Sequence, residues 1–235
     1  MSTITLVILG GLAFFIVYEV VRVIRHALVS KRLGREATIF SRGVLMGGKR
    51  ILIIGDSTSY GTGTSDPAYS LAGRLASDMP EYAIENLSEN AMSLTQLVEK
   101  LRTVEGPYAR MFIHIGGVDT LALTPLHKVR RELTEALEQA QALTRGRVYL
   151  VSVNNPGLVP AFRFPLSWLF GRRSRQVSLV CDEACIARGV HHVPLWQRRE
   201  HDPLLQAPER LFARDGLHPN DEGYGLWYQK IKQAL

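Results

Sequence analysis

The chain of 235 residues is long enough for one α/β domain with a sizeable core and too short for two large domains. Its hydrophobic fraction of 46% and its charged fraction of 21% are ordinary for a globular protein. The formal net charge of +6 arises within residues 1–50, because the later residues carry 20 basic and 20 acidic side chains. The neutral charge of residues 51–235 argues against a nucleic-acid-binding protein.

An apolar segment opens the chain. Residues 4–18 carry no charged side chain, and snorkelling of Glu19 and Arg22 would lengthen the run towards the roughly 20 residues that a bilayer needs. No Lys or Arg precedes the run, which favours an uncleaved anchor over a signal peptide or a docked soluble helix. We therefore predict a transmembrane anchor over residues 1–24 and a basic juxtamembrane linker over residues 25–48, which anionic lipid would attract. The positive-inside rule then places the remaining domain in the cytoplasm.

From residue 49 onward, short apolar strands alternate with helices. The expected strands cover residues 50–55, 82–86, 110–115, 147–153 and 191–195. The expected helices cover residues 69–79, 94–102, 125–143, 175–188 and 221–234. This alternation predicts one domain over residues 49–235, with a parallel sheet covered by helices on both faces. In such sheets the functional loops lie at the carboxyl ends of the strands.

Two short motifs carry the chemistry. Gly55-Asp56-Ser57 directly follows the first predicted strand, and Asp215 and His218 lie three residues apart in a turn bounded by Gly and Pro. A Ser at a strand end and a His oriented by an Asp are the groups needed for nucleophilic acyl transfer. In this interpretation Asp215 holds His218 Nδ1 and leaves Nε2 for Ser57. The alternative is a capping Asp-Ser pair and a chance Asp-x-x-His before a helix.

Four sequence blocks, in order, resemble those of the GDSL/SGNH hydrolase superfamily: Gly55–Ser57, Asn86–Ala91, Gly116–Asp119 and Asp215–Pro219. The resemblance covers roughly residues 49–235. It implies a flavodoxin-like, three-layer α/β/α fold with a five-stranded parallel sheet. It also implies hydrolysis of a carboxylic ester without a metal or other cofactor, with Ser57 as nucleophile, His218 as general base and Asp215 as the partner that orients it.

The oxyanion hole is the part of the family pattern from which this sequence departs. The resemblance implies donation from the Ser57 N–H, from a backbone N–H in the second block and from an Asn side chain in the third. Ala91 occupies the second-block position and still offers an N–H. In the third block, Gly117 is followed by Val118, where the Asn would be. The loss of one oxyanion donor typically costs about 100- to 1000-fold in turnover.

Other asparagines are candidate replacements for the missing donor. Asn154 and Asn155 end the fourth predicted strand on the same edge of the sheet. Their alternative role is to form a turn before Pro156. Asn90, in the second block, could also point towards the site. We include Asn154 among the predicted substrate-binding residues.

An aromatic segment with a basic end covers residues 161–173, after the fourth predicted strand. On an anchored protein this segment would form an interfacial lid that admits an acyl chain. The alternative is a loop packed in the core, followed by a solvated helix start. Cys181 and Cys185 lie on one face of a predicted helix, where a disulfide is awkward, so we expect two free thiols.

These patterns together predict a membrane-tethered serine esterase that acts on a small-molecule or lipid ester, or on an acyl thioester. A second hypothesis is a catalytically weak or inactive relative that binds an acyl or glycan ligand at the membrane, which Val118 favours. A third is a flavodoxin-like module that binds a phosphorylated ligand through the loop rich in Ser, Thr and Gly after Ser57. The third hypothesis predicts that phosphate stabilises the protein against unfolding even after Ser57→Ala.

Overall fold

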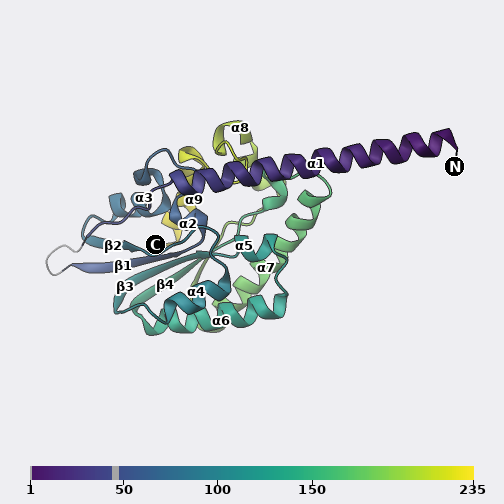
Figure 1. Ribbon diagram of the computed structural model, residues 1–235. Helices are drawn as coiled ribbons and strands as arrows, with labels where there is room; N and C mark the ends of the chain where they lie inside the picture. Colours follow the sequence, from purple (N-terminus) through teal and green to yellow (C-terminus); the bar gives the residue numbers. More distant parts are fainter. Residues whose placement is uncertain (1, 44–47) are drawn as a thin grey trace.

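A five-stranded parallel sheet lies at the centre of the computed structural model, which describes residues 2–43 and 48–235 (Figure 1). The strands follow the order β2-β1-β3-β4-β5. They are β1 (Lys49–Gly55), β2 (Tyr82–Asn86), β3 (Tyr108–Ile115), β4 (Thr144–Ser152) and β5 (His191–Pro194). The carboxyl-terminal halves of β1, β3 and β4 are unbroken runs of buried residues, as expected for strands covered on both faces.

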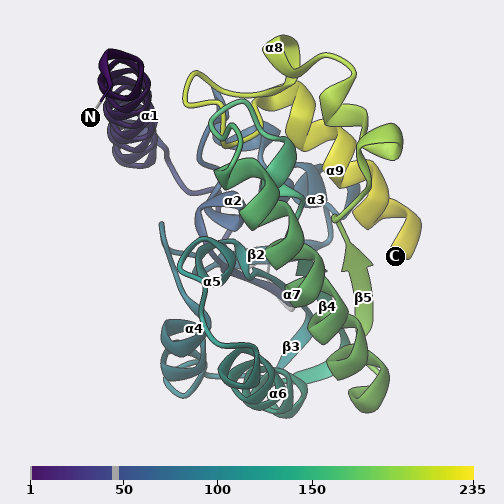
Figure 2. The same ribbon diagram turned by 90° about the vertical axis from the view of Figure 1, so that its right-hand side faces the viewer.

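Helices cover both faces of the sheet (Figure 2). One face carries α4 (Leu94–Leu101), α6 (Leu126–Ala142) and α7 (Leu166–Arg188), and the other carries α3 (Leu71–Asp78) and α9 (Asp221–Ala234). Two separate hydrophobic clusters fill the spaces between sheet and helices, and both expected free thiols are buried in the first. This arrangement confirms the predicted three-layer α/β/α fold with a five-stranded parallel sheet.

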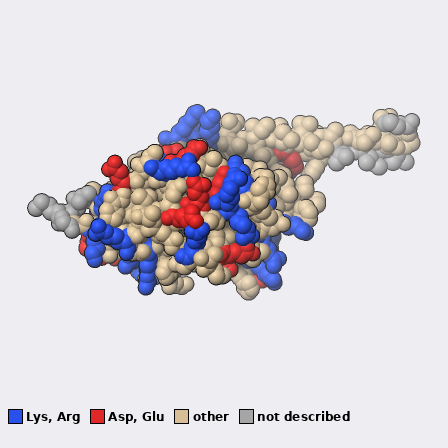
Figure 3. Space-filling view, turned by 90° about the horizontal axis from the view of Figure 1, so that it is seen from below, with Lys and Arg blue, Asp and Glu red and all other residues tan. Residues whose placement is uncertain are grey.

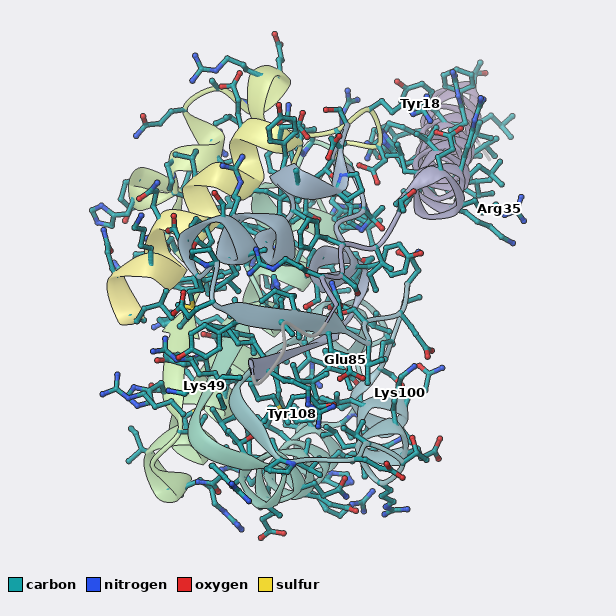
Figure 4. All side chains as sticks on the ribbon, turned by 90° about the vertical axis from the view of Figure 1, so that its left-hand side faces the viewer. Tyr18, Arg35, Lys49, Glu85, Lys100 and Tyr108 are labelled. Carbon is teal, nitrogen blue, oxygen red and sulfur yellow. The ribbon has the colours of Figure 1, made fainter. Side chains whose placement is uncertain are left out.

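The remaining elements are short and lie in the connections. They are α2 (Ser57–Tyr60), α5 (Gly117–Leu121), α8 (Pro208–Leu211), η1 (Pro67–Tyr69), η2 (Pro156–Leu158), η3 (Arg199–His201) and η4 (Pro203–Leu205). Of these, α2 and α5 follow directly on β1 and β3, at the carboxyl edge of the sheet. Figure 4 views the opposite, amino edge, where Lys49 and Tyr108 lie, with α1 set to one side of the sheet.

The helix α7 begins at Leu166, earlier than the predicted start at residue 175. The sequence prediction was wrong here because Gly171 and the mixed aromatic and basic residues around it hide a helical pattern. In the structure Gly171 lies against Gly157, where an added Cβ atom would stand 3.4 Å from the Gly157 Cα. The absence of a side chain at Gly171 therefore lets α7 pack closely against the segment that contains Gly157, and Gly171 does not break the helix.

At the N-terminus, α1 (Thr3–Glu36) is a single helix of 34 residues (Figure 1). It continues through residues 25–36, the first part of the predicted linker, where good helix formers and the Arg32–Glu36 ion pair (2.7 Å) favour a helix. The transmembrane anchor predicted for residues 1–24 is not supported, since no helix in the described part of the chain is long and apolar enough to cross a bilayer. Position 1 of that anchor and positions 44–47 of the linker lie outside the described residues.

The described residues after α1 are fixed to the edge strand β2. Arg42 exchanges backbone hydrogen bonds with Ile84, at 2.8 and 2.9 Å. The Arg42 guanidinium also donates to the backbone carbonyls of Ala76, Met79 and Tyr82. A charged side chain that satisfies several carbonyls in this way ties the connection to the domain, close to the C-terminal end of α1.

Candidate active site

Ser57 lies in a sharp turn between β1 and α2. The strand ends at Gly55, whose φ of 157° and close contact leave no room for a side chain, because an added Cβ would stand 1.9 Å from the His114 carbonyl oxygen. Asp56 then caps α2 by accepting a hydrogen bond from the Thr58 N–H at 3.0 Å. These two residues place Ser57 at the carboxyl edge of the sheet, with its hydroxyl pointing out of the turn.

A chain of hydrogen bonds joins Ser57 to His218 and Asp215. The Ser57 Oγ lies 2.8 Å from His218 Nε2, and His218 Nδ1 lies 2.6 Å from Asp215 Oδ2. Asp215 is fully buried and His218 is 6% exposed. With Nδ1 donating to the carboxylate, Nε2 can accept the serine proton, which is the arrangement that activates a hydroxyl as a nucleophile. The structure therefore brings together all three predicted residues.

Hydrogen bonds from His218 and from two backbone amides keep Asp215 ionised against the effect of burial. Burial alone would raise the pKa of this carboxyl, but the hydrogen bonds from His218 and from the backbone amides of Leu217 and His218 outweigh it and hold the pKa below its usual value. At neutral pH the side chain is therefore a carboxylate. A fixed negative charge at Nδ1 favours the tautomer that leaves Nε2 free and stabilises the imidazolium that forms when the proton is taken.

The sequence model of a family described as GDSL-like Lipase/Acylhydrolase matches residues 53–226. The chain belongs to this family. The matched region contains the Ser57 turn, the second and third sequence blocks and the Asp215–His218 turn, and it leaves out α1. No curated protein sequence matched the chain.

Several solved structures share the fold of this chain at low sequence identity. A crystal structure of TesA aligns with a TM-score of 0.62 and 18% identity, covering 80% of this chain and 98% of the other. The psychrotrophic esterase EstA from Pseudoalteromonas sp., inhibited by monoethylphosphonate, gives 0.58 and 19%, with 79% and 96% covered. A lipase/acylhydrolase from Enterococcus faecalis gives 0.57 and 18%, with 79% and 94% covered.

Two backbone N–H groups are available at the site of this GDSL-like protein. Within the described residues, neither the Ser57 N–H nor the Ala91 N–H has a hydrogen-bond acceptor. Ala91 adopts a φ of 60°, in the left-handed region that favours glycine. Ala91 and His218 line the same cavity. The backbone at Ala91 has therefore kept the conformation expected of a glycine position, although the residue has a side chain.

The third block reaches the site without its polar side chain. Gly117 begins α5, and an added Cβ there would stand 3.2 Å from Asp56 Oδ2, which places the block beside the turn that carries Ser57. Val118 follows in the first turn of α5 and is half-buried. Its isopropyl group cannot donate a hydrogen bond, so the two backbone N–H groups at Ser57 and Ala91 remain the donors nearest to the expected pattern.

Two of the three candidate asparagines are engaged elsewhere. Asn90 accepts from Thr62 Oγ1 at 2.6 Å and donates to the Gly34 carbonyl at 2.9 Å. Asn155 accepts from the Gly157 N–H and donates to the Gln197 carbonyl, so it forms the turn that was its alternative role. The half-buried Asn154 makes no side-chain hydrogen bond to any residue that the structure describes, and none joins it to Ser57 or His218.

Sequence reasoning missed the contribution of α1 to this site. The His26 Nδ1 lies 2.8 Å from the Asp215 carbonyl oxygen, and Arg22 donates to the Ala161 carbonyl at 2.8 Å. Glu19 pairs with Arg22 at 2.7 Å, so these two charges face the domain and do not snorkel from a membrane. The partly buried positions of α1 recur at helical spacing, at 19, 22, 23, 26, 29, 30, 33 and 34. This face mixes charged, polar and apolar residues, so no apolar stripe marked it in the sequence.

The loop rich in Ser, Thr and Gly packs directly behind the histidine. Gly63 has a φ of 103°, and an added Cβ would stand 2.4 Å from the Pro219 carbonyl oxygen and 3.1 Å from the His218 Cβ. The Tyr224 hydroxyl, on α9, donates to the Thr62 carbonyl at 2.8 Å. The loop thus supports the His218 turn from one side, which is a structural role rather than the phosphate binding of the third hypothesis.

Proposed function

We propose that the protein is a serine hydrolase that cleaves a carboxylic ester, such as a lipid ester, or an acyl thioester, through a covalent acyl-enzyme on Ser57. The observation that carries the proposal is the continuous hydrogen-bond chain from Ser57 Oγ through His218 to Asp215. Membership of the GDSL-like lipase/acylhydrolase family supports acyl hydrolysis as the reaction class.

The geometry supports a two-step mechanism. Ser57 Oγ attacks the substrate carbonyl carbon while its proton passes to His218 Nε2, and the carbonyl oxygen becomes an oxyanion held by the N–H groups of Ser57 and Ala91. Collapse of this intermediate breaks the bond to the leaving oxygen or sulfur, which takes the proton from Nε2. Water, deprotonated by His218, then attacks the acyl-enzyme and releases the carboxylic acid and free Ser57.

Reaction with a fluorophosphonate tests the assignment of Ser57. Incubation of the full chain with ethyl fluorophosphonate should add one phosphonyl group, read by intact mass, because an activated serine displaces fluoride. Ser57→Ala should abolish the adduct, and His218→Ala should slow it at least about 1000-fold, since the base is lost. The neighbouring buried Ser59→Ala provides a matched control that should react normally. An unreactive wild-type protein with native circular dichroism would contradict the proposal.

A ligand-binding protein is the second candidate function, and Val118 is the observation that favours it. A site that lacks one oxyanion donor can still hold an acyl or glycan ligand beside Ser57. This candidate predicts that a non-hydrolysable ester analogue stabilises the wild-type protein and Ser57→Ala equally in thermal unfolding. The serine hydrolase predicts, in addition, phosphonylation of Ser57.

We also propose that the protein acts at a membrane, with its hydrolase domain on the cytoplasmic side. The projecting part of α1 exposes apolar side chains, among them Phe14 (75% exposed) and Val17 (61% exposed). In Figure 3 the coloured atoms of this part are mostly tan, whereas Lys and Arg gather where the helix meets the domain. Basic side chains on the C-terminal side of an apolar helix favour binding to anionic lipid, and the cytoplasmic leaflet carries the negative surface potential that attracts them.

Vesicle flotation checks the membrane proposal. The full chain should float with phosphatidylglycerol vesicles, and the double variant Phe14→Glu, Val17→Glu should remain at the bottom of the gradient, because two charges replace apolar side chains on the projecting helix. The control variant Phe164→Glu changes an exposed loop of the domain instead of α1, and it should float like the wild type. Flotation of the double variant at the wild-type level would contradict the proposal.

A further inference from the structure

An apolar cavity of about 550 Å³ adjoins His218 and Ala91. Its volume falls in the range of small-molecule sites, roughly 300–1,000 Å³. One wall comes from the segment at the start of α7, through Phe162, Leu166 and Phe170. Two of these rings pack edge to face, with the centroids of Phe162 and Phe170 4.8 Å apart, so this wall is already formed without a ligand.

The opposite wall is α1. Val23 and Ala27 line the cavity from this helix, which lies outside residues 53–226, the region that the family model matches. Figure 1 shows the C-terminal half of α1 running across the domain while its N-terminal half projects beyond it. The cavity is thus lined in part by an element that lies outside the region matched by the family model.

Polar contacts hold this wall in place. Besides the bonds from Arg22 to Ala161 and from His26 to Asp215, the Gly34 carbonyl accepts from Asn90, and Glu36 pairs with Arg214. The loops so contacted include the aromatic segment, the second block and the turn that precedes His218. Since α1 contacts each of these three loops, its position relative to Ser57 is determined.

We propose that this cavity binds the acyl chain of the substrate and that α1 limits the length of chain that fits. The inference rests on the proposed function, since it places the acyl half of the ester that Ser57 attacks. His218 lines this apolar cavity and its Nε2 lies 2.8 Å from Ser57 Oγ, so the cavity is placed to receive the substituent of a carbonyl carbon held at Ser57. Each methylene group buried there increases transition-state binding about fourfold, from about 0.8 kcal/mol per methylene.

Chain-length profiles of the full-length protein test the proposal. With p-nitrophenyl acetate, butyrate, hexanoate and octanoate, kcat/KM should rise about fourfold per methylene until the cavity is filled. Ala27→Trp places an indole in the cavity and should lower the ratio of kcat/KM for octanoate to kcat/KM for acetate at least about tenfold. Ala13→Trp, the same substitution at an exposed position of the projecting part of α1, should keep the wild-type profile.

A second variant guards against a simple loss of docking by Ala27→Trp. Leu166→Ala enlarges the cavity from the opposite wall and should shift the preferred chain length upwards. A wild-type protein with no chain-length preference, or an Ala27→Trp profile equal to that of the wild type, would overturn the inference. Reaction with ethyl fluorophosphonate separates failure of this inference from failure of the proposed function. If Ser57 reacts and the chain-length profile is flat, the cavity does not bind the acyl chain. If Ser57 does not react, the proposed function itself is wrong.

Discussion

Replacing Asp215 by Asn should lower kcat about 10,000-fold while leaving the protein folded. The carboxylate now accepts from His218 Nδ1 at 2.6 Å. A carboxamide that turns its NH₂ group to Nδ1 would reverse the tautomer of His218, so that Nε2 would carry a hydrogen and could not take the proton of Ser57. Initial rates with a short p-nitrophenyl ester, together with the rate of phosphonylation, measure the effect.

Asp202→Asn supplies the matched control. Asp202 is also buried, 6% exposed, and accepts a hydrogen bond from the backbone N–H of Leu204. Among the described residues, no histidine donates a hydrogen bond to its side chain. Its substitution should leave kcat within about threefold of the wild type. Should Asp215→Asn retain more than a tenth of wild-type turnover with an unchanged phosphonylation rate, Asp215 would not orient His218.

Replacing Val118 by Asn should raise kcat about 100- to 1000-fold, with KM little changed. The third block already lies beside the Ser57 turn, because Gly117 packs against Asp56. Asn at position 118 would add a side-chain N–H to the two backbone donors at Ser57 and Ala91. A donor that stabilises only the oxyanion acts on turnover rather than on substrate binding, and steady-state kinetics with p-nitrophenyl butyrate separate the two.

Val118→Leu serves as the control, because Leu resembles Asn in shape and has no donor. It should leave kcat within about threefold of wild type. Equal rates for Val118→Asn and the wild type would mean that another group already fills the third donor position, or that the site no longer hydrolyses esters. Phosphonylation of Ser57 decides between these outcomes, since only the first keeps an activated serine.

Much of this site could be predicted because its parts follow from local sequence. The turn after β1 depends on Gly55 and the capping Asp56, and the Asp215–His218 pair is three residues apart in one turn. Ser57 and His218 are 161 residues apart, yet a parallel sheet brings loops from its carboxyl edge together. Local sequence patterns, combined with the rule that loops meet at the carboxyl edge of a parallel sheet, were therefore sufficient to predict that these residues lie together.

The docking of α1 onto the domain could not be predicted from such local signals. Its apolar residues point in all directions, and its inward contacts are made by Arg22 and His26 to backbone carbonyls. Every residue offers a carbonyl, so nothing in the composition of the segment reveals which ones it binds. A charged stretch after an apolar run predicts a membrane linker equally well, and only the packed structure separates the two interpretations.

The contact between His26 and Asp215 also sets an order of events during synthesis. The two residues are 189 positions apart, so at about 5–20 residues per second a ribosome makes the second roughly 10 to 40 seconds after the first. Throughout that interval α1 has no Asp215 turn to bind, and Ser57 has no His218. The helix α1 is therefore exposed on the growing chain before the turn that holds it exists, and Ser57 is first activated only after the Asp215–His218 turn has been made.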